Sequence, residues 1–506
     1  MSATEQEYKN HIKELEQQVR LLKEQVDFLT RKLYGTKSEK TSTLEIEGQM
    51  SLFNEIETCA DPDAHEPELV EIEKHLRKRK YTGQREELVK NLPHSKVLHT
   101  IDEREQICDN CGSTMVKVGE EFVRTEVQFI PAKLKVIDHY RETYECRSCR
   151  KNGTPYMEKA PVPYPPVLHS LASASTITWL IHQKFELSIP LYRQEKEWEA
   201  LGLRLSRATM SNWLLVVYRD WLVHIVHRLK QRYLHIDETH VQVLKEPGRK
   251  NTSDSYMWVY CSIRDAVNPI RYFEYQPGRS GKYPEAFLRE YEGYIHTDAY
   301  SGYNAVSGVK RCLCYTHLRR AFVDALPKDI HNSEASKPAE AILRLNQFFN
   351  IESELEALPP DQKKKERLIR EKPLLEAFWS WAEKSAIGEL PKSKLSKAFH
   401  YALNNREGFW NYLEDGNCSI SNSLAENCIR PFVIGRKNWL FSGSPKGAEA
   451  SAGIYTLVET AKANGLAPMK YIKYILSDMP GSAFLEHPEY LDDYLPWNPL
   501  VKEFCR

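Results

Sequence analysis

The chain of 506 residues is too long for one hydrophobic core, so roughly two to four domains are expected. Its 70 basic and 70 acidic residues cancel, which excludes the strong overall positive field of many nucleic-acid-binding proteins but leaves local basic clusters available for phosphate contacts. Because it has no apolar run of about 18 residues and no N-terminal secretory signal, we expect a cytoplasmic protein without a membrane-spanning helix.

The segment 1–35 carries a heptad repeat and is predicted to form a coiled coil. Branched residues at the first heptad position, with Leu at the fourth, favour a parallel two-stranded coil. This pattern predicts self-association through an N-terminal zipper, and an amphipathic helix packed on its own globule is the alternative. The repeat consists of Ile12, Leu15, Val19, Leu22, Val26, Leu29 and Leu33.

Residues 36–100 lack periodicity and are predicted to form a linker with a basic run at 74–80. Such a run can lie along a phosphate backbone, although charge runs in linkers are often only solvated. The candidate DNA-binding residues of this run are Arg77, Lys78, Arg79 and Lys80.

Two CxxC pairs occur in the segment 101–160. Each pair can present two thiolates to one ion, and two pairs complete a tetrahedral zinc site. Because β-branched and aromatic residues fill the interval between the pairs, we predict a zinc ribbon with a small sheet. Four thiolates leave no open coordination position, so this Zn²⁺ is expected to be structural. The expected ligands are Cys108, Cys111, Cys146 and Cys149.

Helical patterns fill the segment 167–230. A break at Gly202 is followed by a helix at 207–217, with Ser206 as the candidate N-cap. This spacing permits a helix-turn-helix whose second helix enters a DNA groove, although plain helical packing explains the same pattern. The side chains offered to DNA would be those of Arg207, Thr209, Ser211 and Asn212.

From residue 231 the pattern changes from helix to strand. Three strand-like runs joined by short turns predict an antiparallel meander. A helix, two further strands and a second helix follow, and this order is expected of a ribonuclease-H-like α/β core. The predicted elements are strands 233–244, 255–264 and 270–276, helix 282–291, strands 293–298 and 310–315, and helix 317–325.

Three acidic residues are candidate catalytic groups. Asp237 and Asp298 lie within or just after apolar strands, where an ionised carboxylate is costly unless it faces solvent, a cation or a metal. Glu426 lies in a predicted helix at 424–429, which Pro431 is expected to disturb, and an extended stretch bounded by glycines is predicted to follow.

A basic and aromatic strip accompanies Glu426. Arg430 is four residues away and therefore shares its helix face. A carboxylate beside such a strip suits a site that holds a metal and a phosphate chain together, and a surface ion pair is the alternative. The candidate DNA-binding residues of the strip are Arg430, Arg436, Lys437 and Trp439.

Taken together, these motifs resemble the DDE transposases of bacterial insertion sequences, specifically the IS66 family. The chain differs in having Ala299 where the family usually has Gly, and Leu-Cys-Tyr-Thr-His at 313–317 where Gly-Cys-Trp-Ala-His is more usual; Cys314 and His317 are retained. The similar segments are the zipper with 33–39, the zinc ribbon, 189–194, 206–209, 237–239, 298–303, 422–444 and the C-terminal 491–498.

The resemblance implies that Asp237, Asp298 and Glu426 are the three acidic ligands, and it selects Asp237 over Glu238. They would hold two Mg²⁺ (or Mn²⁺) ions about 3.5–4 Å apart for in-line phosphoryl transfer. The activity implied is cleavage at the ends of the element and joining of each 3′-hydroxyl to target DNA in a bacterial, nucleoid-associated complex, together with accessory transposition proteins. The implied fold is multidomain α+β, with the core at 231–326 and 415–465, a helical insertion at 327–414 and a tail at 466–506.

Two other functions are compatible with parts of the sequence. A zinc-ribbon DNA-binding regulator, or a transposase-derived protein without activity, would also use the zipper, the ribbon and the helix-turn-helix, but it has no use for the complete acidic set. A His-based metal hydrolase is the weaker alternative, because strand alternation puts His235 and Asp237 on one face and His240 on the other. The remaining residues of that set would be His296 and His317.

Overall fold

The computed structural model describes residues 134–153, 157–229, 235–263, 266–327 and 336–506. All of these belong to one compact unit. The expected zipper, the basic run at 74–80, Cys108 and Cys111 lie outside the described residues, and the side chain of Cys149 is not described.

A mixed sheet forms the centre of this unit, with strands in the order β5-β4-β3-β6-β7. Strands β3, β4 and β5 pair antiparallel, as the predicted meander requires, and β6 and β7 continue the sheet in parallel with β3. A short strand, β8 (Phe441–Ser442), pairs with the end of β3. The long strands are β3 (His235–Val243), β4 (Asp254–Cys261), β5 (Arg271–Gln276), β6 (Gly293–Thr297) and β7 (Val309–Leu313).

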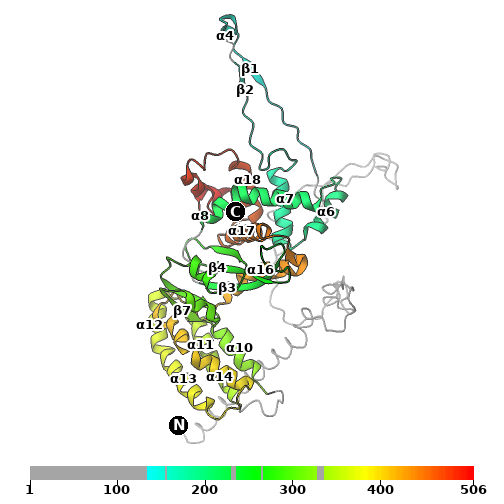
Figure 1. Cartoon of the computed structure of the whole chain (residues 1–506). Coiled ribbons are helices and arrows are strands. Elements are labelled where there is room, and N and C mark those ends of the chain that lie inside the picture. The colour runs from blue at the N-terminus through cyan, green and yellow to red at the C-terminus, as the bar shows by residue number, and fades with distance from the viewer. Residues whose placement is uncertain (1–133, 154–156, 230–234, 264–265, 328–335) are drawn as a thin grey trace, which may run out of the picture. The chain divides into compact units, whose positions relative to one another are not determined.

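Apolar and aromatic side chains bury the sheet from both faces. In β4, the run from Met257 to Cys261 is almost completely inaccessible, as expected for a central strand that is covered on both sides. Helix α17 (Pro445–Ala463) packs on β5, and α16 (Ser423–Trp439) packs on β3 and β4 (Figure 1). The connection from β5 to β6 contains α9 (Lys282–Phe287), which is shorter than the predicted helix at 282–291.

Helix α16 corrects the prediction for the segment around Glu426. The helix does not end near Pro431 but continues to Trp439, so Arg436, Lys437 and Trp439 are helical rather than extended. Proline removes one backbone hydrogen bond, but burial of Ile429 and Phe432 on one face compensates for that loss. Leu440, whose φ is 65°, follows the last helical residue, and its N–H still donates to the Arg436 carbonyl.

The helices before the sheet include the two elements of the predicted helix-turn-helix. These are α6 (Leu191–Ala200) and α7 (Arg207–Val217), and the Ser206 side chain caps α7 by accepting a hydrogen bond from the Thr209 N–H, as predicted. Met210, Trp213, Leu214 and Val217 bury the inner face of α7. The other elements of this part are α5 (Ala174–Ile181), the π-helical turns η3 (His182–Glu186) and η4 (Tyr218–Leu222), and α8 (Val223–Arg228).

The C-terminal segment, predicted as a tail at 466–506, packs against these helices. Helix α18 (Pro468–Asp478) contacts α5 and α17, and α19 (Pro499–Cys505) contacts α18. Arg228 donates two hydrogen bonds to Asp492, at 2.6 and 2.8 Å. The N-terminal end of the described chain contains a small hairpin of β1 (Thr143–Glu145) and β2 (Met157–Lys159), with the short helix α4 (Arg147–Lys151) between them.

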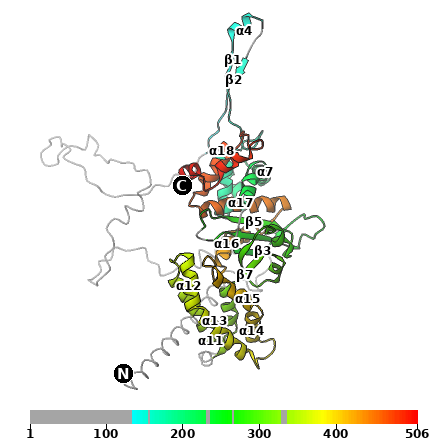
Figure 2. The same cartoon turned by 90° about the vertical axis from the view of Figure 1, so that its left-hand side faces the viewer.

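The helices between Asp298 and Glu426 lie together in one group (Figure 2), and their side chains form a second hydrophobic cluster. This cluster joins β7 and α10 (Tyr315–Asp324) to the inserted helices, and its largest fully buried side chain is Trp379. Arg367 is also fully buried and forms an ion pair with Glu352 at 2.6 Å. The inserted helices are α11 (Lys337–Glu354), α12 (Pro360–Arg370), α13 (Lys372–Ala386), α14 (Lys394–Asn404) and α15 (Arg406–Trp410).

Candidate active site

Strand register brings the first two candidate carboxylates to the same edge of the sheet. His235 in β3 is paired with His296 in the parallel strand β6. Asp237 and Asp298 each follow the paired histidine by two residues, so they lie on neighbouring strands at equivalent positions. Asp298 comes directly after β6, where the chain leaves the sheet.

The third carboxylate, Glu426, comes from the first turn of α16. Asn422, the residue before this helix, fastens it to β3: its side-chain N–H donates to the Ile236 carbonyl at 2.8 Å, and its side-chain oxygen lies 3.1 Å from Nδ1 of His235. Asn422 is only 2% exposed, so both contacts are buried. A buried hydrogen-bonded link of this kind holds the start of α16 beside Asp237.

The electrostatics of Asp237 are those of a carboxylate enclosed with other acids. Burial raises its pKa to about 7, and the negative charges of Glu238, Asp298 and Glu426 add to this effect, while a hydrogen bond from the Glu238 N–H at 2.9 Å opposes it. A bound cation would relieve the same repulsion that a proton relieves. Asp298 and Glu426, the other two carboxylates predicted from sequence, therefore both lie close enough to Asp237 to affect its charge.

Asp237 and Glu238, which spacing could not distinguish, have different surroundings. Arg279 lies 2.6 Å from the Glu238 carboxylate, which also accepts a hydrogen bond from Tyr303 and whose side chain is only 3% exposed. Burial raises the pKa of Glu238, while the Tyr303 hydrogen bond and the Arg279 charge counteract the rise. Glu238 is thus already paired within the protein, whereas no hydrogen bond or ion pair with a basic side chain is recorded for Asp237 among the described residues.

The turn that carries Asp298 is held by Arg311. This guanidinium donates hydrogen bonds to the carbonyls of Asp298 and Tyr300, at 2.5 and 2.7 Å, and to the Thr297 hydroxyl at 2.7 Å. The Tyr300 N–H in turn donates to the Asp298 carboxylate at 2.9 Å. Such a network fixes the backbone at the point where the carboxylate leaves the sheet.

Close backbone contact also shapes this turn. A side chain at Gly281 would place its Cβ only 2.1 Å from the Gly302 carbonyl oxygen, so the start of α9 and the 3₁₀ turn η5 (Ser301–Ala305) approach each other through glycine. Tyr303, in η5, reaches back to Glu238. The Gly302-Tyr303 motif seen in the sequence therefore has a packing role beside the carboxylates.

Glu426 has a second set of neighbours on α10. Its Oε1 lies 3.7 Å from Nδ1 of His317, and Cys314 is close to both. The hydrogen bond with Cys314 raises the pKa of His317, which burial opposes. Burial would raise the pKa of Cys314, but hydrogen bonds from His317 and from the Asn422 N–H more than offset it and leave this pKa below its usual value.

The predicted DNA-binding residues lie in two places. On α16, Arg430 and Lys437 are exposed, whereas Trp439 is half-buried against Phe432. Arg436 is committed to the protein, since it donates hydrogen bonds to the Thr239 hydroxyl at 2.9 Å and to the His240 carbonyl. On α7, Arg207 and Asn212 are exposed, and Thr209 and Ser211 are half-buried.

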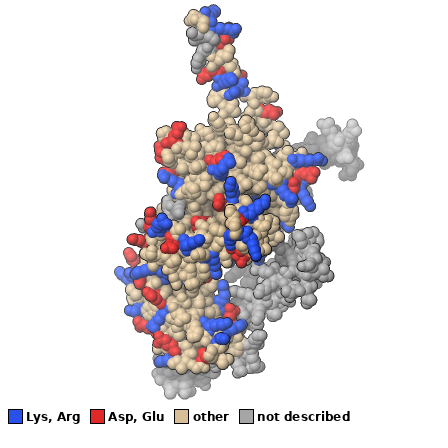
Figure 3. Space-filling model, viewed as in Figure 1, with Lys and Arg blue, Asp and Glu red and all other residues tan. Residues whose placement is uncertain are grey.

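Charge is mixed over the surface rather than gathered in one field. Figure 3 shows Lys and Arg interspersed with Asp and Glu on the face viewed, in keeping with the zero net charge. Phosphate contacts would thus depend on particular basic residues and not on an overall potential.

The histidines of the weaker hydrolase alternative do not form an open site. His235 and His296 are buried, and their rings stack with centroids 4.3 Å apart. Nε2 of His296 accepts a hydrogen bond from the Ser419 N–H at 2.8 Å, and His240 is exposed. These two buried rings therefore support the sheet behind the carboxylates.

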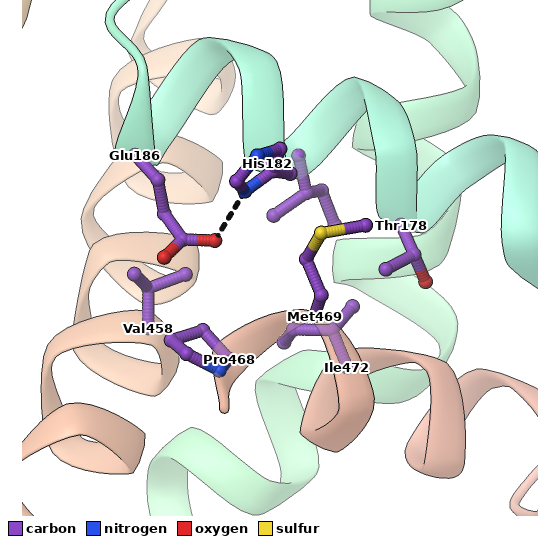
Figure 4. A pocket seen from close by; sticks show the side chains of 8 residues that line it. Thr178, His182, Glu186, Val458, Pro468, Met469 and Ile472 are labelled. Atoms are coloured by element: carbon purple, nitrogen blue, oxygen red, sulfur yellow. Dashed lines mark hydrogen bonds and ion pairs between the residues drawn. The ribbon is translucent and has the colours of Figure 1, made fainter. Parts of the chain in front are cut away.

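A small hollow lies elsewhere and includes none of the carboxylates (Figure 4). It lies between α5, η3, α17 and α18 and is lined mostly by apolar groups, with His182 and Glu186 joined at 2.8 Å. It is too shallow to enclose a water molecule, so we assign it no ligand.

Several residues that matter for the geometry were not assigned roles from the sequence. Arg279 and Arg311 gave no local signal, because their partners lie far away in the sequence or on backbone carbonyls. Asn422 stands in the Glu426 motif, and its position just before a predicted helix was the one available sign that it has a special role.

Comparison with known proteins identifies the family. Residues 169–450, more than half of the chain, match the family model described as "Transposase IS66 family". The chain therefore belongs to the IS66 family of transposases, and the resemblance seen in its motifs is confirmed. Residues 105–150 match the "zinc-finger binding domain of transposase IS66", which supports a structural zinc, and residues 21–97 match "Transposase C of IS166 homeodomain".

Relatives of similar length occur in Sinorhizobium fredii. The uncharacterized protein y4jD is 25% identical over 98% of this chain and 98% of its own length. The uncharacterized protein y4qI is 27% identical over 93% of this chain and 87% of its own length, and y4hP is 26% identical over 77% and 73%. The family supports a transposase role with DNA as the partner. Within the described residues, no helix combines the length and apolar character needed to cross a membrane.

Proposed function

We propose that this chain is a DDE-type transposase that cleaves the ends of an insertion sequence and joins the freed 3′-hydroxyls to target DNA. Its catalytic carboxylates are Asp237, Asp298 and Glu426. The observation that carries this proposal is that Asp298, just after β6, and Glu426 of α16 both lie close enough to Asp237 of β3 to add to the rise that burial and Glu238 cause in its pKa. The strand order and directions around them support a ribonuclease-H-like core.

The donor set fits divalent cations. Carboxylate oxygens are the preferred ligands of Mg²⁺ and Mn²⁺. Burial and neighbouring negative charge destabilise the ionised form of Asp237, and a bound cation would relieve this repulsion. When bound, the cations supply charge stabilisation to the transferred phosphoryl group and lower the pKa of the attacking oxygen.

The protein's own residues supply position and charge balance. Arg279 neutralises Glu238 and lies 3.8 Å from Asp298, so it limits the net negative charge that an incoming DNA phosphate meets. Arg311 fixes the Asp298 turn, and Asn422 fixes the start of the helix that carries Glu426. Positioning of this kind carries a large part of catalysis in phosphoryl transfer.

DNA is held by elements outside the carboxylate cluster in this proposal. The side chains of Arg207, Thr209 and Asn212 on α7 lie in a groove of the DNA. On α16, the four predicted contact residues are Arg430, Arg436, Lys437 and Trp439. Arg430 and Lys437 are the exposed ones and contact phosphates, whereas Arg436 also donates a hydrogen bond to the Thr239 hydroxyl of β3. The basic run Arg77, Lys78, Arg79 and Lys80 adds further phosphate contacts.

The remaining parts of the chain assemble the complex. A structural Zn²⁺ is held by Cys108, Cys111, Cys146 and Cys149, and the N-terminal zipper joins two copies. Accessory transposition proteins are further partners. A purely regulatory DNA-binding protein is a poorer account, because it gives no reason for three mutually repelling carboxylates beside the sheet.

The direct test is strand cleavage by Glu426→Gln. The substrate is a duplex that carries the inverted repeats flanking the gene, with Mg²⁺ present. The variant is expected to bind this DNA as the wild type does and to lose cleavage, because the amide cannot supply the same negative charge.

The matched control is Glu459→Gln. Glu459 is a half-buried glutamate on α17 that pairs with Lys462 at 2.9 Å, outside the carboxylate cluster. The Glu459→Gln variant should cleave the DNA duplex as fast as the wild type does. Wild-type cleavage by Glu426→Gln would refute the assignment.

A further inference from the structure

A second group of ligand-type side chains adjoins the carboxylates. Cys314, His317 and Glu426 each offer one ligand atom, and these atoms all lie within 4.8 Å of one another. Cys314 precedes α10, His317 is in the first turn of that helix, and Glu426 comes from α16. The group therefore bridges two helices that flank the catalytic edge of the sheet.

The local backbone favours a metal-binding geometry for the first two residues. A Cys-x-x-His spacing at a helix start places both side chains on one side of the turn, as in chelating pairs. The Asn422 N–H donates to the Cys314 sulfur at 3.2 Å, a contact that stabilises a thiolate and orients it. Cys314 is buried, whereas the His317 and Glu426 side chains are 29% and 28% exposed, which leaves a path for an ion.

Two polar atoms in this group contact each other but make no hydrogen bond in the described part of the chain. Nδ1 of His317 and Oε1 of Glu426 are both buried and make no hydrogen bond within the described residues. They face each other at 3.7 Å, which is too long for a hydrogen bond. Buried polar atoms without a hydrogen bond are rare in proteins, and a bound ion is one of the few reasons for them.

We propose that Cys314, His317 and Glu426 form a binding site for a thiophilic divalent cation, with Zn²⁺ as the ion that fits best. Thiolate and imidazole ligands select zinc over magnesium, and three protein ligands leave one position open. The site is distinct from the zinc ribbon and from the all-oxygen arrangement at Asp237 and Asp298. Its effect is to link α10 to α16 and to hold one oxygen of Glu426, leaving the other oxygen for the catalytic edge.

A neighbouring group of possible metal ligands does not have the unsatisfied polar atoms that mark the Cys314 group. His296, Cys312 and Cys418 are also close together and buried. However, Nε2 of His296 already accepts the Ser419 N–H, and hydrogen bonding to Cys312 and His296 lowers the pKa of Cys418 to about 6. That group satisfies its own polar atoms, so it needs no ion.

The test is the metal content of the full chain, loaded with Zn²⁺, dialysed and measured by plasma mass spectrometry. The wild type should hold about two zinc ions per chain, one of them in the ribbon. Cys314→Ser and His317→Gln should each lower this to about one. Cys428→Ser is the matched control, since Cys428 lies on the same helix as Glu426 but outside the group, and it should keep the wild-type content.

A spectroscopic measurement distinguishes loss of the metal site from misfolding of the Cys314→Ser variant. With Co²⁺ in place of Zn²⁺, the wild type should show thiolate-to-cobalt charge-transfer absorption that is partly lost in both variants, while circular dichroism stays unchanged. About one zinc per chain in the wild type, or equal zinc in His317→Gln and wild type, would overturn the proposal. Neither readout requires DNA cleavage, so failure of the catalytic proposal would leave this result interpretable.

Discussion

Replacing Asp237 by Asn is expected to stabilise the metal-free protein above neutral pH. Burial and three neighbouring acids raise the pKa of Asp237 from 3.8 to about 7. The unfolded chain releases this proton first, so the folded state loses stability as pH rises from about 4 to about 7 and stays at the lower value above that window. Asparagine removes the charge and can still accept the hydrogen bond from the Glu238 N–H.

The size of the stabilisation expected for Asp237→Asn follows from the difference between the pKa values of Asp237 in the unfolded and folded states. The interval between 3.8 and about 7 corresponds to about 4 kcal/mol, which is an upper bound because the surroundings relax around an ionised group. We therefore expect Asp237→Asn to gain about 2 kcal/mol and to melt about 2–5 °C higher at pH 8 without Mg²⁺. At pH 4 the gain should nearly vanish, because the folded wild type is then protonated at this group and the unfolded chain is about half protonated.

The assay is thermal unfolding at pH 4 and pH 8 in buffers freed of Mg²⁺ by dialysis, without a chelator that would strip zinc. Added Mg²⁺ should raise the melting temperature of the wild type and have little effect on the variant, because binding to the folded state alone stabilises it. A variant that melts at or below the wild-type temperature at pH 8, together with no response of the wild type to Mg²⁺, would refute the reasoning.

Two further variants test the positioning and DNA-binding roles. Arg311→Lys should bind DNA normally and cleave about 10²-fold more slowly, since one ammonium cannot replace hydrogen bonds to Asp298, Tyr300 and Thr297; unchanged cleavage would contradict this role. Arg207→Ala should weaken DNA binding and reduce the slope of log affinity against log salt by about 0.9, as measured by fluorescence anisotropy at several salt concentrations; an unchanged slope would exclude a phosphate contact there.

Local sequence patterns were sufficient to predict features that depend on a single helix or on strands joined by short turns. Alternation and turn spacing predicted the three-stranded meander, and Ser206 as the cap of α7 followed from its place before an apolar helix. The extent of α16 was predicted wrongly, because Pro431 is a local helix breaker while the burial of Ile429 and Phe432 that outweighs it depends on tertiary packing.

For the candidate site, too, local sequence predicted some features, while others depend on tertiary contacts. Three acids in plausible places could be named from sequence, but spacing did not separate Asp237 from Glu238. The distinction depends on Arg279 and Tyr303, which approach from 41 and 65 residues away along the chain. Partners so distant along the chain leave no periodic pattern in the sequence. Only the folded structure therefore shows that Glu238 is paired with Arg279 and Tyr303, whereas Asp237 has no such partner among the described residues.

The most direct test of the central claim is iron-directed cleavage of the polypeptide itself. Fe²⁺ replaces Mg²⁺ at carboxylate sites, and with ascorbate and peroxide it generates radicals that cut the nearest backbone. A shared cation site predicts cuts near Asp237, Asp298 and Glu426 together, all suppressed by excess Mg²⁺ and all lost in Asp237→Asn. Absence of cuts at these three segments, or cuts that persist in excess Mg²⁺, would contradict a common divalent-cation site.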